Sequence, residues 1–425
     1  MITRIEATNY RCFERLDVDL HSFAVLVGAN GAGKTTLLDI PGLLGDCLEQ
    51  QNIGQAFITR QNNKPPRCST LNELVFGGQG RHFILSMEAE LPENVIQALL
   101  PIQSGPVQND TKRWLRYIRY EVRFEIFNQR ELVVGSEHLF LFSRKNAPSR
   151  NGIRIHGDFS GQTGWRTILK RESGADAVFR VETQKAAKSK PMHIQASMLA
   201  LPKLKFESAD DFPAASWFHD LLSQRSVFYQ PNLSLLQSAC APGLPKEIMG
   251  NGANLPWLAL ELQQDENRFS MWVEHVQTAL PQVSGIRVKE REEDHHAYFI
   301  ITYNGGYEIT SSGLSEGTLR ILALTILPYL VKLPFLIITE EPENGIHPRA
   351  IETVLQSLSS VYDSQMLVSS HSPVVLAQSK LDQILCARLA ENGAATMVSG
   401  TNHPQLKDWQ GQVDLGALFA AGVLG

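Results

Sequence analysis

A glycine-rich segment near the N-terminus has the residue types that hold a polyphosphate. It follows an apolar run at 23–27, which we expect to be a buried strand, and it precedes an expected helix. Its glycines let backbone N–H groups close around a phosphate at the positive end of that helix. Lys34 is predicted to reach the β- and γ-phosphates, and the Thr35 hydroxyl is predicted to bind Mg²⁺. The segment therefore predicts an ATP site formed by Gly28, Ala29, Asn30, Gly31, Ala32, Gly33, Lys34, Thr35 and Thr36.

Two adjacent carboxylates end a second apolar run, at 335–339. Glu340 is predicted to hold Mg²⁺, directly or through a water, although this position is usually an aspartate. Glu341 is predicted to be catalytic, because its carboxylate can polarise the attacking water for in-line displacement. Taken alone, two acids at a strand end are more often solvated charges. The phosphate-binding segment upstream favours the catalytic interpretation.

Two further segments place polar groups where they could meet a phosphate. Ser315 and the backbone of Gly317 stand at the start of an expected helix, which makes an anion site, although Ser315 could also be a simple helix cap. His371, flanked by serines, follows an expected strand at 365–369. A lone histidine is usually structural, yet this one is predicted to be a catalytic residue that donates a hydrogen bond to the γ-phosphate.

Hydrophobic periodicity predicts the elements that position these residues. Strands are expected at 2–7, 16–20, 23–27, 83–91, 114–126, 131–142, 298–303, 335–339 and 365–369. Helices are expected at 35–44, 213–223, 254–263, 270–280, 318–327 and 349–359. Pro41 and Gly42 should kink or shorten the first helix. The charged side chains that alternate along 114–126 are expected to face solvent, with cross-strand ion pairs.

Composition narrows the class of protein. With 425 residues, 43% hydrophobic and 20% charged, the chain is typical of soluble globular proteins with ample core. No stretch approaches about 18 uncharged apolar residues, so no membrane span is expected. The first residues lack the apolar core of a signal peptide, which favours a cytoplasmic protein. The five cysteines form no CxxC pair and fit reduced thiols.

Charge is unevenly distributed along the chain. The net charge is −5, but residues 143–190 contain eleven Lys or Arg and four Asp or Glu, which leaves about −12 for the remainder. Such a basic segment could attract DNA or RNA phosphates or an acidic protein partner. A solvated basic loop without a ligand is the alternative.

Four motifs follow one another along the chain: the glycine-rich segment, the segment around Ser315, the paired glutamates and His371. In this order they resemble the motifs of the SMC, RecF and OLD branch of ABC ATPases, the AAA-family ATPases of bacterial defence and DNA-repair operons. The best-matching stretches are 5–44, 313–323 and 333–376, with weaker matches at 251–255 and 288–303. The resemblance implies an α/β P-loop NTPase whose ABC-type ATPase head has a mixed sheet, an antiparallel β subdomain and a helical or irregular insertion.

This resemblance also implies a division of the chain. We expect an N-terminal ATPase lobe at 1–142, an insertion at 143–310 that carries the basic segment, and a C-terminal ATPase lobe at 311–425. In such ATPases the signature loop around Ser315 faces away from its own P-loop, so a homodimer would sandwich two ATP molecules. Asn344 and His347 would then sense the opposite nucleotide, and Gln79 is a candidate for the Q-loop.

The leading interpretation is an ATP-hydrolysing switch that dimerises around ATP, with Mg²⁺ as its metal. It would control a nearby-encoded effector, such as a nuclease, or a DNA transaction, in bacterial anti-phage defence. Only 54 residues follow His371, without a DxD pair, so the TOPRIM nuclease of full-length OLD proteins is expected to be absent. One alternative is a RecF-like DNA-repair ATPase that binds DNA directly. Another is a nucleotide-binding scaffold without hydrolysis, which the intact Lys34 and Glu341 disfavour.

Overall fold

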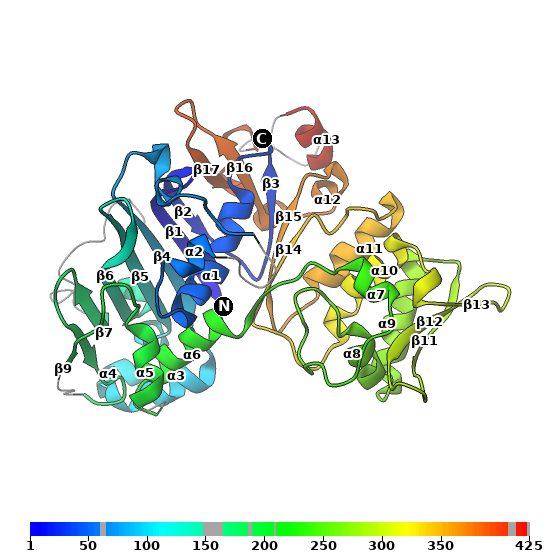
Figure 1. Cartoon of the computed structure of the whole chain (residues 1–425), viewed down its shortest axis with the longest axis horizontal. Coiled ribbons are helices and arrows are strands. Elements are labelled where there is room, and N and C mark those ends of the chain that lie inside the picture. Colours follow the sequence, from blue (N-terminus) through cyan, green and yellow to red (C-terminus); the bar gives the residue numbers. More distant parts are fainter. Residues whose placement is uncertain (60–64, 148–164, 186–188, 208–209, 407–413, 423–425) are drawn as a thin grey trace. The chain divides into compact units, whose positions relative to one another are not determined.

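The structure is a computed structural model, and it forms two compact units (Figure 1). It describes residues 1–59, 65–147, 165–185, 189–207, 210–406 and 414–422. Unit 1 comprises Met1–Leu20, Thr36–Arg225 and Leu389–Met397, and unit 2 comprises His21–Thr35, Ser226–Arg388 and Val398–Gly425. The units thus interleave along the chain, whereas the sequence suggested three consecutive segments.

An eight-stranded sheet forms the framework of unit 1, in the order β2-β1-β4-β5-β6-β7-β8-β9. Its strands are β1 (Ile2–Tyr10), β2 (Phe13–Asp19), β4 (His82–Glu90), β5 (Tyr117–Phe127), β6 (Glu131–Phe142), β7 (Trp165–Glu172), β8 (Ala177–Arg180) and β9 (Ser189–Met192). All neighbours in this order pair antiparallel. The last three strands come from the basic segment, which therefore extends the sheet. Its residues 148–164 and 186–188 lie outside the described residues.

Helices cover the apolar face of this sheet. They are α1 (Lys34–Glu49), α2 (Gln55–Ile58), α3 (Glu93–Leu99), α4 (Gly105–Gln108), α5 (Leu201–Glu207) and α6 (Pro213–Ser223). Phe57 of α2 meets the rings of Phe83 and Phe124 edge-on, each at 5.9 Å between centroids. Phe218 of α6 contacts Tyr120 in the same way, also at 5.9 Å. The aromatic residues of β4 and β5 thereby fix two helices to the sheet.

The first helix is longer than the expected range 35–44, so Pro41 and Gly42 do not shorten it. The helix α1 continues through Pro41 to Glu49. Proline removes one backbone hydrogen bond, but the apolar side chains around it, among them Ile40 and Leu43, are fully buried and offset that loss. Gly45 also allows a close approach, because a Cβ there would lie 2.3 Å from the carbonyl oxygen of Leu222 in α6.

The charged face of β5 is solvated only in part: the expected cross-strand ion pairs are present, but the prediction of a solvated face is wrong for Arg119 and Glu121. Arg119 and Glu121 are each only 2% exposed. The Arg119 guanidinium pairs with Glu6 of β1 at 2.5 Å, with Glu88 of β4 at 2.7 Å and with Glu121 at 3.3 Å. Burial raises the pKa of Glu121 to about 8, although the charge of Arg119 acts in the opposite direction. The three strands place complementary charges in register, which a single strand's pattern cannot reveal.

Unit 2 contains most of a six-stranded sheet in the order β10-β14-β15-β3-β16-β17, of which β17 is assigned to unit 1 up to Met397. Its strands are β3 (Phe23–Gly28), β10 (Ser226–Phe228), β14 (Leu336–Glu340), β15 (Gln365–Ser370), β16 (Ile384–Leu389) and β17 (Ala395–Ser399). The pairs β10–β14, β14–β15, β15–β3 and β3–β16 are parallel. Because the carboxyl ends of parallel strands share one edge, the segments after β3, β14 and β15 meet there.

A second, smaller sheet and a set of helices complete unit 2. The small sheet is antiparallel and contains β11 (Val283–Glu290), β12 (Ala297–Tyr303) and β13 (Glu308–Thr310). The helices are α7 (Leu233–Gln237), α8 (Leu255–Leu262), α9 (Glu266–Ala279), α10 (Glu316–Thr325), α11 (Pro348–Ser359), α12 (Pro373–Ala377) and α13 (Leu415–Ala420). The helices predicted near α8, α9, α10 and α11 are confirmed. Trp272 of α9 is fully buried and donates to the Thr325 hydroxyl of α10 at 3.2 Å.

Among the described residues, no helix is long and apolar enough to cross a membrane. The five cysteines are free thiols in the structure.

Candidate functional site

The glycine-rich loop connects β3 to α1 in a conformation that requires glycine. Gly28 has φ 140°, and a Cβ there would lie 2.2 Å from the carbonyl oxygen of Ala387 in the adjacent strand β16. Gly31 and Gly33 have φ of 78° and 88°, also in the left-handed region. The loop thus turns back over the end of β3 and delivers the chain into α1 at Lys34.

The Lys34 side chain folds back over the loop. Its Nζ donates to the carbonyl oxygens of Gly28 at 2.8 Å and Ala29 at 2.9 Å, and the residue is 6% exposed. Burial lowers the pKa of Lys34, while the nearby carboxylates of Glu341 and Glu340 act in the opposite direction. Within the described ranges no carboxylate forms an ion pair with this ammonium, which leaves its charge available to an anion.

The loop and the end of β14 meet through Thr35 and Glu340. The Thr35 Oγ1 donates to Glu340 Oε1 at 2.5 Å. Hydroxyl and carboxylate oxygens are the hard donors that Mg²⁺ prefers. Two adjacent ligands of octahedral Mg²⁺ lie about 2.9 Å apart, so a small opening of this pair would admit the ion. The residues present therefore fit the metal expected here.

Glu341 points to a different set of partners from Glu340. Its carboxylate accepts a hydrogen bond from the Asn344 side-chain amide, and its Oε1 lies 3.7 Å from His371 Nε2. Its backbone N–H donates to the Ser369 carbonyl at 2.8 Å, and its φ of 45° is unusual for a residue other than glycine. Such local strain often accompanies a functional site. The two adjacent glutamates thus differ in their contacts: Glu340 faces Thr35, and Glu341 faces His371.

A third carboxylate, which sequence reasoning did not assign a role, holds the loop that carries His371. The Ser370 hydroxyl donates to Glu343 Oε1 at 2.5 Å and accepts a hydrogen bond from the Ser372 backbone at 3.0 Å. Burial raises the pKa of Glu343, while the contacts from Ser370 and from the His371 backbone lower it. The only signal in the sequence was the third acid of the string Glu340-Glu341-Pro342-Glu343.

The signature segment forms the start of α10. Ser315 caps the helix, because its Oγ accepts from the Thr318 backbone at 3.2 Å. Gly317 packs against the loop after β14, since a Cβ there would lie 2.7 Å from the Gly345 carbonyl oxygen. No hydrogen bond or ion pair joins this segment to the glycine-rich loop in the part of the chain that the structure describes. The structure therefore joins the glycine-rich loop to Glu340 and Glu341 to His371, whereas Ser315 and Gly317 have no hydrogen bond or ion pair with these residues in the described ranges.

The two remaining predicted residues have other contacts. His347 caps α11, and its Nδ1 accepts from the Arg349 backbone at 3.3 Å. Gln79 belongs to unit 1 and lines a cavity there.

Comparison with known families finds two partial matches. Residues 1–46 match the family described as "AAA ATPase domain". Residues 201–377 match the family described as "AAA domain, putative AbiEii toxin, Type IV TA system". Both matched ranges contain motifs of the site, namely the glycine-rich loop in the first and the signature and paired glutamates in the second.

Two individual proteins are also similar to this chain. An OLD nuclease of Thermus scotoductus (strain ATCC 700910 / SA-01) is 44% identical over 62 residues, which are 14% of this chain and only 12% of the nuclease. A crystal structure of an SMC head, bound to the C-terminal winged-helix domain of ScpA, is similar with a TM-score of 0.50 and 12% identity. The similarity covers 93% of this chain and 96% of that chain. The comparisons confirm the predicted α/β fold of an ABC-type ATPase head.

Proposed function

We propose that this chain, an ABC ATPase of the SMC and OLD type, binds Mg²⁺–ATP, hydrolyses it across a homodimer and thereby switches an effector. The observation that carries the proposal is the separation of the two glutamates at the end of β14. Glu340 faces Thr35, whereas Glu341 faces Asn344 and His371. In-line phosphoryl transfer needs these two environments, one for the metal and one for the water.

The binding step follows from the loop and its lysine. Thr35 and Glu340 would hold Mg²⁺, which neutralises charge on the β- and γ-phosphates when it is bound. Lys34 would exchange the carbonyls of Gly28 and Ala29 for phosphate oxygens, which are stronger partners for an ammonium. The loop glycines would bring backbone N–H groups to the phosphates.

Glu341 would carry out the hydrolytic step. Its carboxylate would accept a proton from the attacking water, while the amide of Asn344 fixes the orientation of that carboxylate. His371 lies next to the same carboxylate and would donate a hydrogen bond to the γ-phosphate. Glu340 would thus serve the metal and Glu341 the attacking water.

A dimer would give the signature segment its ligand. The N-terminus of α10, where Ser315 caps the Thr318 N–H, is a position that favours an anion. Among the described residues no hydrogen bond or ion pair joins this terminus to the glycine-rich loop of the same chain, which supports a role in the site of a second subunit. The family matches to a putative toxin and an OLD nuclease support a controlled effector, such as a nuclease, and a place in anti-phage defence.

Phosphate release and oligomeric state test this function together. The Glu341→Gln protein should bind ATP like the wild type, release phosphate at least about 100-fold more slowly and accumulate as a dimer in ATP. Lys34→Ala should lose ATP binding and remain monomeric. An exposed lysine of unit 2, Lys332, supplies the matched control Lys332→Ala. Wild-type turnover by Glu341→Gln would refute the assignment of this residue.

A further inference from the structure

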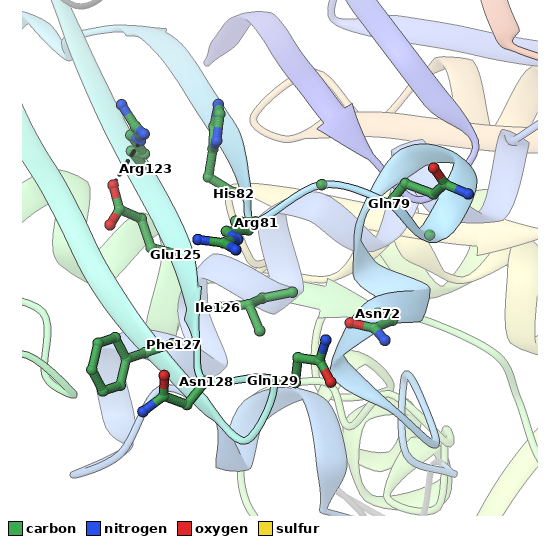
Figure 2. A pocket seen from close by; sticks show the side chains of 12 residues that line it. Asn72, Gln79, Arg81, His82, Arg123, Glu125, Ile126, Phe127, Asn128 and Gln129 are labelled. Atoms are coloured by element: carbon green, nitrogen blue, oxygen red, sulfur yellow. Dashed lines mark ion pairs between the residues drawn. The ribbon is translucent and has the colours of Figure 1, made fainter.

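Unit 1 contains a polar cavity with no role in the proposed function. Its volume is about 980 Å³. One wall is the loop at 72–80, the opposite wall is the end of the β5–β6 hairpin at 125–129, and Arg81 lies between them (Figure 2). Every lining residue belongs to unit 1, whereas the paired glutamates and the glycine-rich loop up to Thr35 belong to unit 2.

Groups that donate hydrogen bonds dominate the lining. The nitrogen-bearing side chains come from both walls and are Asn72, Gln79, Arg81, His82, Arg123, Asn128 and Gln129. The lining has one carboxylate, Glu125, whose Oε1 lies 3.0 Å from Arg123 Nε. The Arg81 guanidinium has no ion pair or hydrogen bond within the described ranges, so its charge is not neutralised. The cavity therefore offers a positive charge and several amides to a ligand.

The walls of the cavity are held in place by backbone contacts. Asn9 Nδ2 donates to the carbonyl oxygen of His82, at the start of β4, at 2.8 Å. Gly80 lets the loop pack tightly, because a Cβ there would lie 2.4 Å from Val75 Cγ1 and 2.7 Å from Asn9 Nδ2. Asn128 and Gln129 have φ of 48° and 58°, which closes the hairpin in a tight turn. Preformed walls reduce the entropy that a ligand must lose on binding.

The rim carries an aromatic ring. Phe127 is 57% exposed at the end of β5, next to Asn128 (Figure 2). A solvent-exposed phenylalanine offers a flat apolar surface on which a base can stack. Side-chain amides such as those of Asn128 and Gln129 match the paired donor and acceptor of base edges.

We infer that this cavity binds a nucleotide unit, either free or within a single-stranded nucleic acid. Arg81 would contact the phosphate, Phe127 would stack on the base, and the amides of Asn128 and Gln129 would contact the base edge. The ring and the amides distinguish this ligand from an acidic peptide, which would use only the positive charge.

The test compares Arg81→Ala with a matched control in the full chain. Arg130 is an exposed arginine of the same hairpin that does not line the cavity, so Arg130→Ala removes the same charge nearby. The probes are fluorescein-labelled oligothymidine, measured by anisotropy over a salt series, and thymidine monophosphate, measured by NMR. Thymidine monophosphate lacks the β-phosphate that a P-loop binds.

Arg81→Ala should weaken oligothymidine binding by about five- to tenfold and lower the salt slope by about 0.7, the value for one phosphate contact on a single strand. Arg130→Ala should stay within about twofold of the wild type. Loss of only thymidine monophosphate binding in Arg81→Ala would identify a free nucleotide as the ligand. Unchanged binding of both probes, no binding of either probe by the wild type, or equal losses in both variants would overturn the inference.

Discussion

The hydroxyl of Ser370 donates a hydrogen bond to the carboxylate of Glu343, and this bond joins the loop after β14 to the end of β15. His371 is the next residue along the chain, and its Nε2 lies 3.7 Å from Glu341. The half-buried Glu343 therefore holds the residue before His371 and lies two residues along the chain from Glu341. We interpret it as a positioning residue of the hydrolytic site.

Glu343→Ala should lower kcat for ATP about tenfold and leave KM within about twofold. The reason is that the loss affects the placement of His371 rather than the contacts of Lys34 with phosphate. Steady-state phosphate release gives both constants. Glu352→Ala, at an exposed acid of α11, is the matched control and should behave like the wild type. A parallel rise of KM without a fall of kcat would contradict the positioning role.

Magnesium affinity should depend on the hydroxyl of Thr35. Thr35→Val keeps the shape of the side chain but removes the oxygen that lies 2.5 Å from Glu340. The Mg²⁺ concentration for half-maximal turnover should rise about tenfold, because one oxygen ligand is lost. Thr35→Ser restores the hydroxyl and should return the Mg²⁺ requirement to the wild-type range. Equal requirements in the valine and serine variants would exclude Thr35 as a ligand.

The strands around the site could be predicted because each contains consecutive apolar residues. The runs at 23–27, 335–339 and 365–369 became β3, β14 and β15, and the polar residues that follow them meet at one edge of the sheet. The tight loop could also be predicted from its glycines, since Gly28, Gly31 and Gly33 adopt backbone angles that other residues avoid.

Contacts between distant strands could not be predicted in the same way. The hydrogen bond between Ser370 and Glu343 depends on which strand ends are neighbours, and a sequence pattern does not specify that. The ion pairs of Arg119 depend on the register of β1, β4 and β5, so the alternating pattern did not reveal that Arg119 and Glu121 are buried. The continuation of α1 beyond Pro41 depends on the surroundings that bury the helix.

Composite sites should be recovered in mixed dimers of two inactive chains. Ser315→Asp keeps a side chain that caps α10 but adds a negative charge where the partner's γ-phosphate is expected. Lys34→Ala removes the ammonium of the glycine-rich loop. Each variant alone should be inactive, whereas a mixed dimer contains one site with wild-type Lys34 and Ser315. Phosphate release should therefore reappear on mixing.

Differentially tagged chains, purified in two steps, establish that mixed dimers are present. Mixing Lys34→Ala with Glu341→Gln is the matched control. In that mixture one composite site lacks the Lys34 ammonium and the other lacks the Glu341 carboxylate, so the mixed dimer should remain inactive. Absence of turnover in verified mixed dimers of Ser315→Asp and Lys34→Ala would contradict a site shared between subunits.

Stability of the eight-stranded sheet should depend on pH through Glu121. Burial raises the pKa of this carboxyl to about 8 from an ordinary value of 4.5, so its contribution to stability is complete below about 4.5 and is lost as the pH rises through about 8. Urea unfolding should show that, between about pH 6 and about pH 8, the wild type loses about 1–2 kcal/mol more than Glu121→Gln. Glu131→Gln, at an exposed glutamate of β6, should follow the wild type. Parallel pH profiles of the wild type and Glu121→Gln would show that Glu121 is ionised in the folded chain, with Arg119 compensating its burial.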